Sequence, residues 1–233
     1  MISMIHTALT KRLLRLCLLV VSVSGPNFIW AQQTTLYDLQ PPANSAYVRI
    51  IWGSAASAFD VSVGNKNRQS AVPPATPSDY MILPAGKHEI TVRAGSSIHR
   101  LSVDVESSRS ITVLLIEDGK STRTIAIEDK INSNKLKAII SVYHLGGMSP
   151  VDLNTVDGKT LIFSNIAVGS SASLVVNPIS LAYVVSQAGS KESIASANLD
   201  MKSGEAYSLV IFKDKTGRSH TKAFTNAVER FQK

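Results

Sequence analysis

An internal repeat constrains this sequence more than any other feature. Three segments of the first half recur in the same order in the second half: residues 58–63 with 149–155, the pair 83–84 with 177–178, and residues 110–120 with 206–217. The spacing is nearly constant, because Asp60 and Asp152 are 92 residues apart and Pro84 and Pro178 are 94 apart. A unit of this length is close to an immunoglobulin-sized sandwich of roughly 100 residues. The sequence therefore predicts two tandem copies of one small domain.

The hydrophobic residues after the N-terminal segment follow a period of two, which indicates strands. In residues 87–94 the apolar Ile90 and Val92 point one way, while Glu89 and Thr91 point the other. Similar runs, separated by clusters of turn residues, occur at residues 47–52, 101–105, 111–116, 136–143, 181–185 and 207–212. Short strands at this spacing are typical of sandwiches. We expect an all-β fold of two tandem antiparallel β-sandwich domains, at residues 32–133 and 134–233, joined at the polar stretch 128–137.

The N-terminal segment has the character of a secretory signal peptide. Three basic residues at positions 11, 12 and 15 precede the apolar run 16–23, and the order basic, apolar, polar is typical of export. We expect a signal peptide at residues 1–31 that is cleaved after Ala31, with Ser24 or Gly25 as alternative cleavage positions. The apolar run is shorter than the ~20 residues of a membrane helix, so we expect no transmembrane anchor after processing.

Cleavage removes Cys17, the one cysteine of the chain. The mature protein is then expected to have no disulfide, no thiolate metal site and no cysteine nucleophile. Without the three cations of the signal, 21 Lys and Arg stand against 17 Asp and Glu, a net charge of +4. Such a mildly basic surface suits an anionic partner. Nucleic acid is not an expected partner, because an exported chain of this kind has no dense arginine stripe.

The sequence predicts no catalytic, cofactor-binding or metal-binding residues. It has neither a Gly-Asp-Ser motif nor the Gly-x-Ser-x-Gly elbow of serine hydrolases. His144 opens a glycine-containing loop and is interpreted as structural, because no triad geometry is indicated. Three further histidines are interpreted as solvated: His88, His99 and His220. Asp60 and Asp152 are interpreted as turn residues that bond backbone amides two residues further on; a calcium site would need a denser set of oxygen ligands.

Two groups of cations are candidate docking surfaces for an acidic partner or a polyuronate. One lies in the linker and the other on the last hairpin: Lys130, Lys135 and Lys137, and Lys213, Lys215, Arg218 and Lys222. The alternative interpretation is ordinary solvated lysine that protects strand edges from aggregation. Aromatic platforms for sugar rings are sparse, and Trp52, at a strand end, is expected in the core.

Several segments together resemble a known family. They are Leu36-Tyr37-Asp38, Pro41-Pro42-Ala43-Asn44-Ser45-Ala46-Tyr47-Val48-Arg49, Leu83-Pro84-Ala85-Gly86, Asn134-Lys135-Leu136-Lys137-Ala138 and Val156-Asp157-Gly158-Lys159-Thr160. By the order of these pieces the chain is identified as a member of the alginate biosynthesis protein AlgF family, accessory subunits of alginate O-acetylation in Gram-negative bacteria. The resemblance implies a periplasmic coupling protein that acts with a membrane-embedded acyltransferase and periplasmic acetyltransferases.

The resemblance orders the candidate functions. The first is a non-catalytic adaptor in the O-acetylation complex, with those transferases as its partners. The alternative is a tandem carbohydrate-binding module that holds anionic polysaccharide such as alginate directly, motivated by the sandwich fold and the basic hairpin. A third candidate, an O-acetyltransferase or esterase in its own right, has only isolated His and Asp residues in its favour.

Overall fold

The computed structural model of the chain describes residues 41–53, 57–118, 121–147 and 149–231. These ranges contain sixteen β-strands and no helix. Accordingly, no helix within them is long and apolar enough to cross a membrane. The signal peptide expected at residues 1–31 lies outside the described residues.

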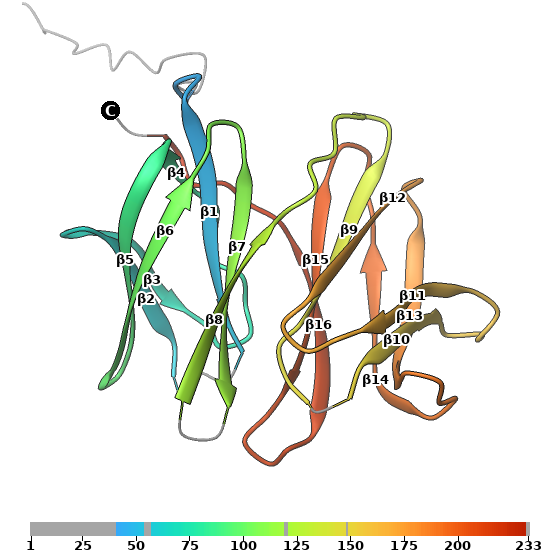
Figure 1. Cartoon of the computed structure of the whole chain (residues 1–233). Helices are drawn as coiled ribbons and strands as arrows, with labels where there is room; N and C mark the ends of the chain where they lie inside the picture. Colours follow the sequence, from blue (N-terminus) through green and yellow to red (C-terminus); the bar gives the residue numbers. More distant parts are fainter. Residues whose placement is uncertain (1–40, 54–56, 119–120, 148, 232–233) are drawn as a thin grey trace, which may run out of the picture. The chain divides into compact units, whose positions relative to one another are not determined.

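The first eight strands form two four-stranded sheets. The strands are β1 (Ser45–Trp52), β2 (Phe59–Val63), β3 (Lys66–Val72), β4 (Met81–Pro84), β5 (Gly86–Ala94), β6 (Ser97–Val105), β7 (Ser110–Asp118) and β8 (Ser121–Glu128). Their order is β4-β1-β7-β8 in one sheet and β3-β2-β5-β6 in the other (Figure 1). Neighbouring strands are antiparallel, apart from the parallel pair β1 and β7.

The last eight strands repeat this arrangement. They are β9 (Ala138–His144), β10 (Val151–Thr155), β11 (Leu161–Ile166), β12 (Ser171–Val176), β13 (Ser180–Gln187), β14 (Ser193–Asp200), β15 (Ala206–Lys213) and β16 (Ser219–Thr225). The sheets are β12-β9-β15-β16 and β11-β10-β13-β14, with β9 and β15 parallel. Adding eight to each strand number of the first sandwich gives the second. The expected all-β fold of two tandem sandwiches is therefore confirmed.

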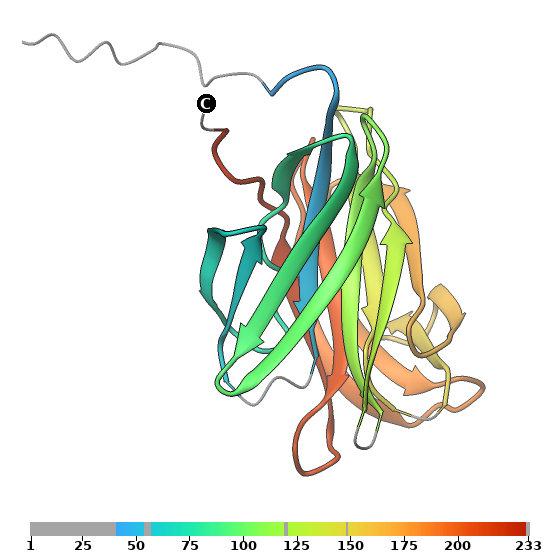
Figure 2. The same ribbon diagram turned by 60° about the vertical axis from the view of Figure 1, so that its left-hand side comes forward.

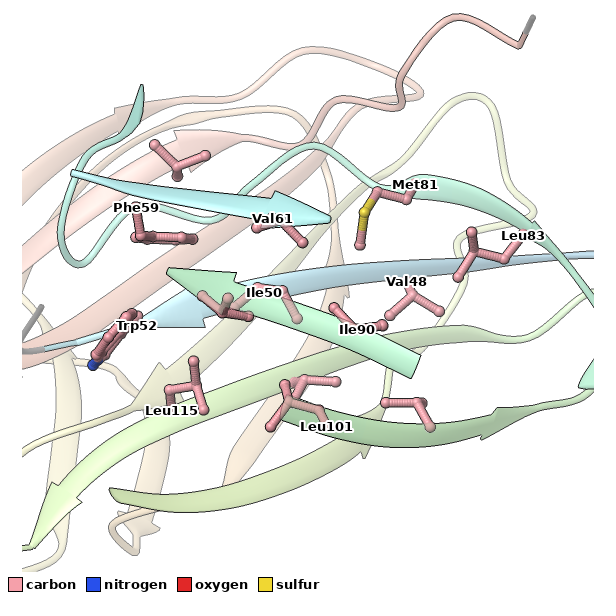
Figure 3. Packing of buried hydrophobic residues seen from close by; sticks show 14 of the residues in the cluster. Val48, Ile50, Trp52, Phe59, Val61, Met81, Leu83, Ile90, Leu101 and Leu115 are labelled. Carbon is pink, nitrogen blue, oxygen red and sulfur yellow. The ribbon is translucent and has the colours of Figure 1, made fainter. Parts of the chain in front are cut away.

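Alternate residues of β1 point into the core of the first sandwich. Val48, Ile50 and Trp52 are buried there, together with Phe59 of the facing sheet and Leu115 of β7 (Figure 3). Fully burying a side chain of this kind contributes about 1.5–3 kcal/mol. Trp52 is thus a core residue, as the sequence indicated.

The central strands β1 and β9 are buried on both faces, and β9 is buried at all seven of its positions. The residues that point away from the two sandwich cores include Ile51 and Tyr143, which meet in a third apolar cluster with Leu114 and Val210. A strand covered on both sides reads as a nearly continuous apolar run. The β1 and β9 sheets therefore pack against each other within one compact unit.

Asp60 and Asp152 occupy the same place in the two repeats, but they do not bond amides two residues further on. Asp60 Oδ1 accepts a hydrogen bond from the backbone N–H of Ala71 at 2.8 Å, and Asp152 Oδ1 accepts one from Asn165 at 2.7 Å. Both amides lie on the neighbouring strand, at register shifts where Ala71 and Asn165 have φ values of 54° and 53°. The turn interpretation was wrong, because each carboxylate stabilises a β-bulge with a residue in the left-handed region.

Candidate functional site

A buried arginine lies between the two sandwiches. Arg49, in the middle of β1, is 1% exposed and points away from the first core. Its Nε donates to Thr112 Oγ1 at 2.8 Å and its Nη1 donates to Asn226 Oδ1 at 2.8 Å. Its Nη2 donates to Tyr143 OH at 3.0 Å and to Ser208 Oγ at 2.9 Å. Since the last three partners belong to the second sandwich, one guanidinium holds both domains.

Asp129, directly after β8, is the anion of this site. Its Oδ2 accepts hydrogen bonds from Tyr80 OH at 2.7 Å and Thr112 Oγ1 at 2.6 Å, and its Oδ1 accepts one from Tyr143 OH. The Arg49 guanidinium lies 4.3 Å from the centroid of the Tyr80 ring. Bonds with one charged partner are roughly twice as strong as neutral ones. We call these seven residues the interdomain polar cluster: Arg49, Tyr80, Thr112, Asp129, Tyr143, Ser208 and Asn226.

Burial controls the protonation of the two phenols in the cluster. It raises the pKa of Tyr143 to about 12 and also raises the pKa of Tyr80, with the charge of Asp129 acting in the same direction and that of Arg49 opposing it. Both hydroxyls therefore stay protonated at physiological pH and donate to Asp129. The cluster is thus a set of mutually satisfied hydrogen bonds that joins the two sandwiches.

The repeat places equivalent groups on the two sides of the cluster. Asp129 and Asn226 each donate their backbone N–H, at 2.8 Å, to the carbonyl of the first residue of β7 or β15. Thr112 then donates to Asp129, and Ser208 donates to Asn226 Oδ1 at 2.7 Å. Sequence reasoning missed this cluster, and the one signal available was a charged residue, Arg49, in the middle of an apolar strand.

Residues after β16 return to the first sandwich. The N–H of Tyr80 donates to Ala227 O at 2.9 Å, and the N–H of Glu229 donates to Tyr80 O at 3.0 Å. The Glu229 carboxylate accepts the N–H of Ile82 at 2.8 Å and forms an ion pair with Arg68. This C-terminal segment therefore extends the edge of the first sandwich beside β4, and it is a second fastening between the domains.

The β15–β16 turn carries the basic hairpin expected from the sequence. All four of its cations are exposed, and we call them the hairpin surface: Lys213, Lys215, Arg218 and Lys222. The strand register places Lys213 opposite Ser219 and Lys222 opposite Val210. Because side chains alternate between faces, Lys213 and Lys222 leave the sheet on opposite faces. The four cations therefore surround the turn instead of lining one face.

Asp214 organises this turn. Its Oδ1 accepts hydrogen bonds from the N–H of Thr216 at 2.8 Å, the hydroxyl of Thr216 at 2.7 Å and the N–H of Arg218 at 3.0 Å. Its Oδ2 lies 2.7 Å from His220 Nε2. The bonds from Thr216 and then His220 hold the pKa of Asp214 well below its usual range. His220 also stacks on Phe212, and its side chain is still 39% exposed, so it is a surface residue with a defined place in the hairpin.

The linker lysines form a separate surface. Lys130 and Lys135 are exposed, whereas Lys137 is half-buried and donates to Asn177; we call the three the linker surface. They precede β9, whereas the hairpin surface begins at the end of β15, which runs parallel to β9. The two surfaces therefore lie at opposite ends of the second sandwich. The chain enters β9 at the top of Figure 1, and the β15–β16 turn lies at the bottom of Figure 1 and Figure 2. At roughly 3.3 Å per residue, β9 separates the two surfaces by ~20 Å.

Two further histidines are held by their surroundings. His144 is buried, with its ring nitrogens 3.0 Å from Ile166 O and 2.7 Å from Gly146 O, and burial lowers its pKa against the effect of these two bonds. His99 packs edge-on against Trp52. The solvated interpretation of His99 was wrong, because this residue is in the inward phase of β6. Among the described residues, no group of three or more His, Cys, Asp or Glu is placed to hold a metal ion.

Fold and site define a class of protein: a tandem β-sandwich protein whose domains are joined by a buried polar cluster and which carries two separate basic surfaces. A family model described as alginate O-acetyl transferase AlgF matches residues 19–208. The chain belongs to this AlgF family, which confirms the resemblance read from the sequence and connects the protein with alginate biosynthesis.

Two relatives named alginate biosynthesis protein AlgF illustrate the similarity. The protein of Pseudomonas syringae pv. tomato is 28% identical over 209 residues, which is 88% of each chain, and that of Pseudomonas aeruginosa is 30% identical over 149 residues, 64% of each chain. The solved C-terminal domain of AlgF from P. aeruginosa is 23% identical, with a TM-score of 0.34, over 40% of this chain and 100% of that one. A CBM26 module from Eubacterium rectale in complex with maltoheptaose is 13% identical, with a TM-score of 0.24, over 81% of this chain and 100% of that one.

Proposed function

We propose that this protein is a non-catalytic periplasmic adaptor in the O-acetylation of alginate. After export through its signal peptide, it couples a membrane-embedded acyltransferase to periplasmic acetyltransferases through protein–protein contacts. Membership of the AlgF family supports the pathway. The observation that carries the adaptor role is the pair of exposed basic surfaces, held at opposite ends of one sandwich in a two-domain body that Arg49 joins.

An adaptor has to hold its partners at a defined separation. Both basic surfaces belong to the second sandwich, where the paired strands β9 and β15 keep a partner bound at one surface at a set distance from whatever occupies the other. Cations at the rim of an interface accelerate encounter with an acidic partner. This effect weakens as salt rises, so partner capture by the hairpin surface is expected to depend on ionic strength.

Neutralising the hairpin surface tests this role. The variant carries Lys213→Gln, Lys215→Gln, Arg218→Gln and Lys222→Gln. A matched control neutralises four exposed cations of the first sandwich: Lys66, Lys87, Arg93 and Arg100. We expect the hairpin variant to fold normally, to capture less acetyltransferase from envelope extracts and to lower alginate acetylation in cells. The control variant keeps wild-type acetyltransferase capture and wild-type alginate acetylation. Normal capture and acetylation by a stably expressed hairpin variant would remove this surface from the mechanism.

One feature of the hairpin favours the second candidate, a carbohydrate-binding module. Lys222 Nζ lies 5.2 Å from the centroid of the Phe212 ring, and Phe212 is itself stacked with His220. A ring beside a cation suits a uronate sugar, whose ring face is apolar and whose carboxylate is anionic. Titration with oligomannuronate separates the candidates. Saturable binding that Lys222→Gln abolishes supports the module, and partner capture without sugar binding supports the adaptor.

A further inference from the structure

Three large aliphatic side chains lie in solvent at the end of the second sandwich where β9 begins. Leu136, Ile131 and Ile179 are 76%, 61% and 53% exposed. The first two are in the linker between β8 and β9, and the third lies between β12 and β13. These loops are neighbours, because Val176, at the end of β12, pairs with Ala138, at the start of β9. We call the three side chains the apolar tip.

The apolar tip is carried by an ordered loop. Asn132 Nδ2 donates to Lys137 O at 2.8 Å, and Asn134 Oδ1 accepts the N–H of Leu136 at 2.9 Å. The loop also rests on the turn before β15, where the N–H of Gly204 donates to Lys137 O at 2.9 Å. Gly204 has a φ of +78°, and a side chain there would come within 3.2 Å of Lys135 O. Leu136 is thus held outward by its own backbone, although a side chain of this kind gains about 1.5–3 kcal/mol when it is buried.

Lysines surround the apolar tip, while the nearby carboxylates have partners within the chain. Lys130, Lys135 and Lys202 are exposed, and Lys137 is half-buried. Three acidic groups lie at the same end. The carboxylate of Glu205 accepts a hydrogen bond from Tyr207 OH, that of Asp200 accepts one from Ser180 Oγ, and that of Asp129 belongs to the interdomain polar cluster. The hydroxyl partners leave Glu205 and Asp200 ionised, but the four lysines outnumber these two carboxylates, so the surface around the tip is positively charged.

We propose that this end of the protein docks on the surface of a membrane that contains anionic lipids. The apolar tip enters the boundary between headgroups and acyl chains, and the lysines contact the anionic headgroups, with their stems along the apolar surface. Exposed apolar patches mark protein or membrane contacts. A membrane is the better fit here, because the aliphatic side chains are exposed on loops that also carry several lysines, and a uniformly negative lipid surface matches such a set of cations. This inference goes beyond the adaptor role, because it assigns the linker surface, one of the two basic surfaces, to lipid. It does not depend on that role, since vesicle binding needs no partner protein.

Co-sedimentation with vesicles tests the proposal. The protein, beginning at Gln32, is mixed with vesicles of phosphatidylethanolamine and phosphatidylglycerol, and separately with vesicles of phosphatidylcholine. We expect binding to the anionic vesicles that weakens as salt rises. Each lysine near a membrane surface strengthens binding about fivefold, so replacing Lys130, Lys135 and Lys202 with Gln weakens it ~100-fold. Ile131→Ser with Leu136→Ser lowers binding at least ~10-fold, because buried methylene groups supply the apolar part.

A matched variant controls for general loss of charge and hydrophobicity. It changes two exposed aliphatic residues and three exposed lysines outside both basic surfaces: Leu174, Ile194, Lys66, Lys159 and Lys191. This variant keeps wild-type vesicle binding, and equal thermal unfolding of all variants shows that folding is unchanged. Failure of the wild-type protein to bind anionic vesicles, or equal binding by the Ile131→Ser, Leu136→Ser variant, overturns the proposal.

A photo-crosslinker at position 136 identifies the occupant in cells. Crosslinks to phospholipid support the membrane assignment. If the crosslinks are to protein alone and the protein does not bind vesicles, the apolar tip belongs to a protein partner and the membrane proposal is overturned.

Discussion

Replacing Arg49 with methionine tests whether the interdomain polar cluster holds the two sandwiches together. Methionine keeps an unbranched stem of similar length but removes every N–H donor of the guanidinium. The substitution breaks four hydrogen bonds, three of which reach the second sandwich, and it leaves Asp129 without a nearby cation in the cluster. We expect a large loss of stability and less cooperative unfolding of the two domains.

The size of the loss follows from the contacts. Removing one member of a buried charged arrangement costs about 3–5 kcal/mol, because the other charge is left uncompensated. Some bonds persist, since Ser208 still donates to Asn226 and both Thr112 and Tyr143 still donate to Asp129. We therefore expect Arg49→Met to lower the free energy of unfolding by about 3 kcal/mol. For a chain of this size, that loss lowers the melting temperature by roughly 6–12 °C.

Urea unfolding of the chain beginning at Gln32, followed by circular dichroism, measures this loss. The matched control is Arg109→Met, since Arg109 pairs with Glu128 at 2.6 Å but its side chain is 53% exposed. An exposed pair contributes about 0–1 kcal/mol, so the control stays close to wild type. If Arg49→Met loses no more than Arg109→Met, the cluster does not stabilise the interface and the reasoning fails.

Four further predictions concern other parts of the chain. Glu229→Gln lowers the free energy of unfolding by about 1–2 kcal/mol in the same urea assay, because the Ile82 and Arg68 contacts lose a charged acceptor; an unchanged value would mean that the C-terminal segment does not fasten the domains. Asp152→Ala lowers the free energy of unfolding more than Asp60→Ala does, by about 1 kcal/mol for each lost hydrogen bond, because Asp152 also accepts the N–H of Gly189 at 2.9 Å. Folded variants of either residue keep alginate acetylation, and the reverse order of stabilities would contradict the bulge assignment. The bonds to Asp214 lower its pKa, so its ionised carboxylate stabilises the hairpin turn fully above the unfolded-state pKa of about 4. This stabilisation is lost as the pH falls through the lower pKa of the folded state. The amide NMR signals of Thr216 and Arg218 report the change, and the Asp214→Asn variant does not show it. Residues 32–133 and 134–233, expressed separately, each give dispersed amide spectra, although each is less stable than in the whole chain, which buries the cluster around Ile51 and Tyr143; if neither half gives such a spectrum, the domains do not fold independently.

Local patterns in the sequence were enough for the fold class and for the equivalence of the two halves. Side chains alternate across a strand whatever the strand pairs with, so Ile90 and Val92 could be assigned to a core from their spacing alone. The repeat likewise placed Asp60 and Asp152 at equivalent positions, which the structure shows in their equivalent bulges. Their hydrogen-bond partners could not be read in the same way, because each amide belongs to a neighbouring strand more than ten residues away.

Tertiary structure alone decided the sites. The period of two separates the faces of a strand but does not say whether the second face meets water or another sheet, so Arg49 could not be recognised as the centre of a buried cluster before the β1 and β9 sheets were seen to pack together. The basic residues could be found in the sequence, but their separation into the hairpin and linker surfaces depends on the parallel pairing of β9 with β15. Both results arise from contacts between residues that are far apart in the chain, and such contacts leave no trace in local spacing.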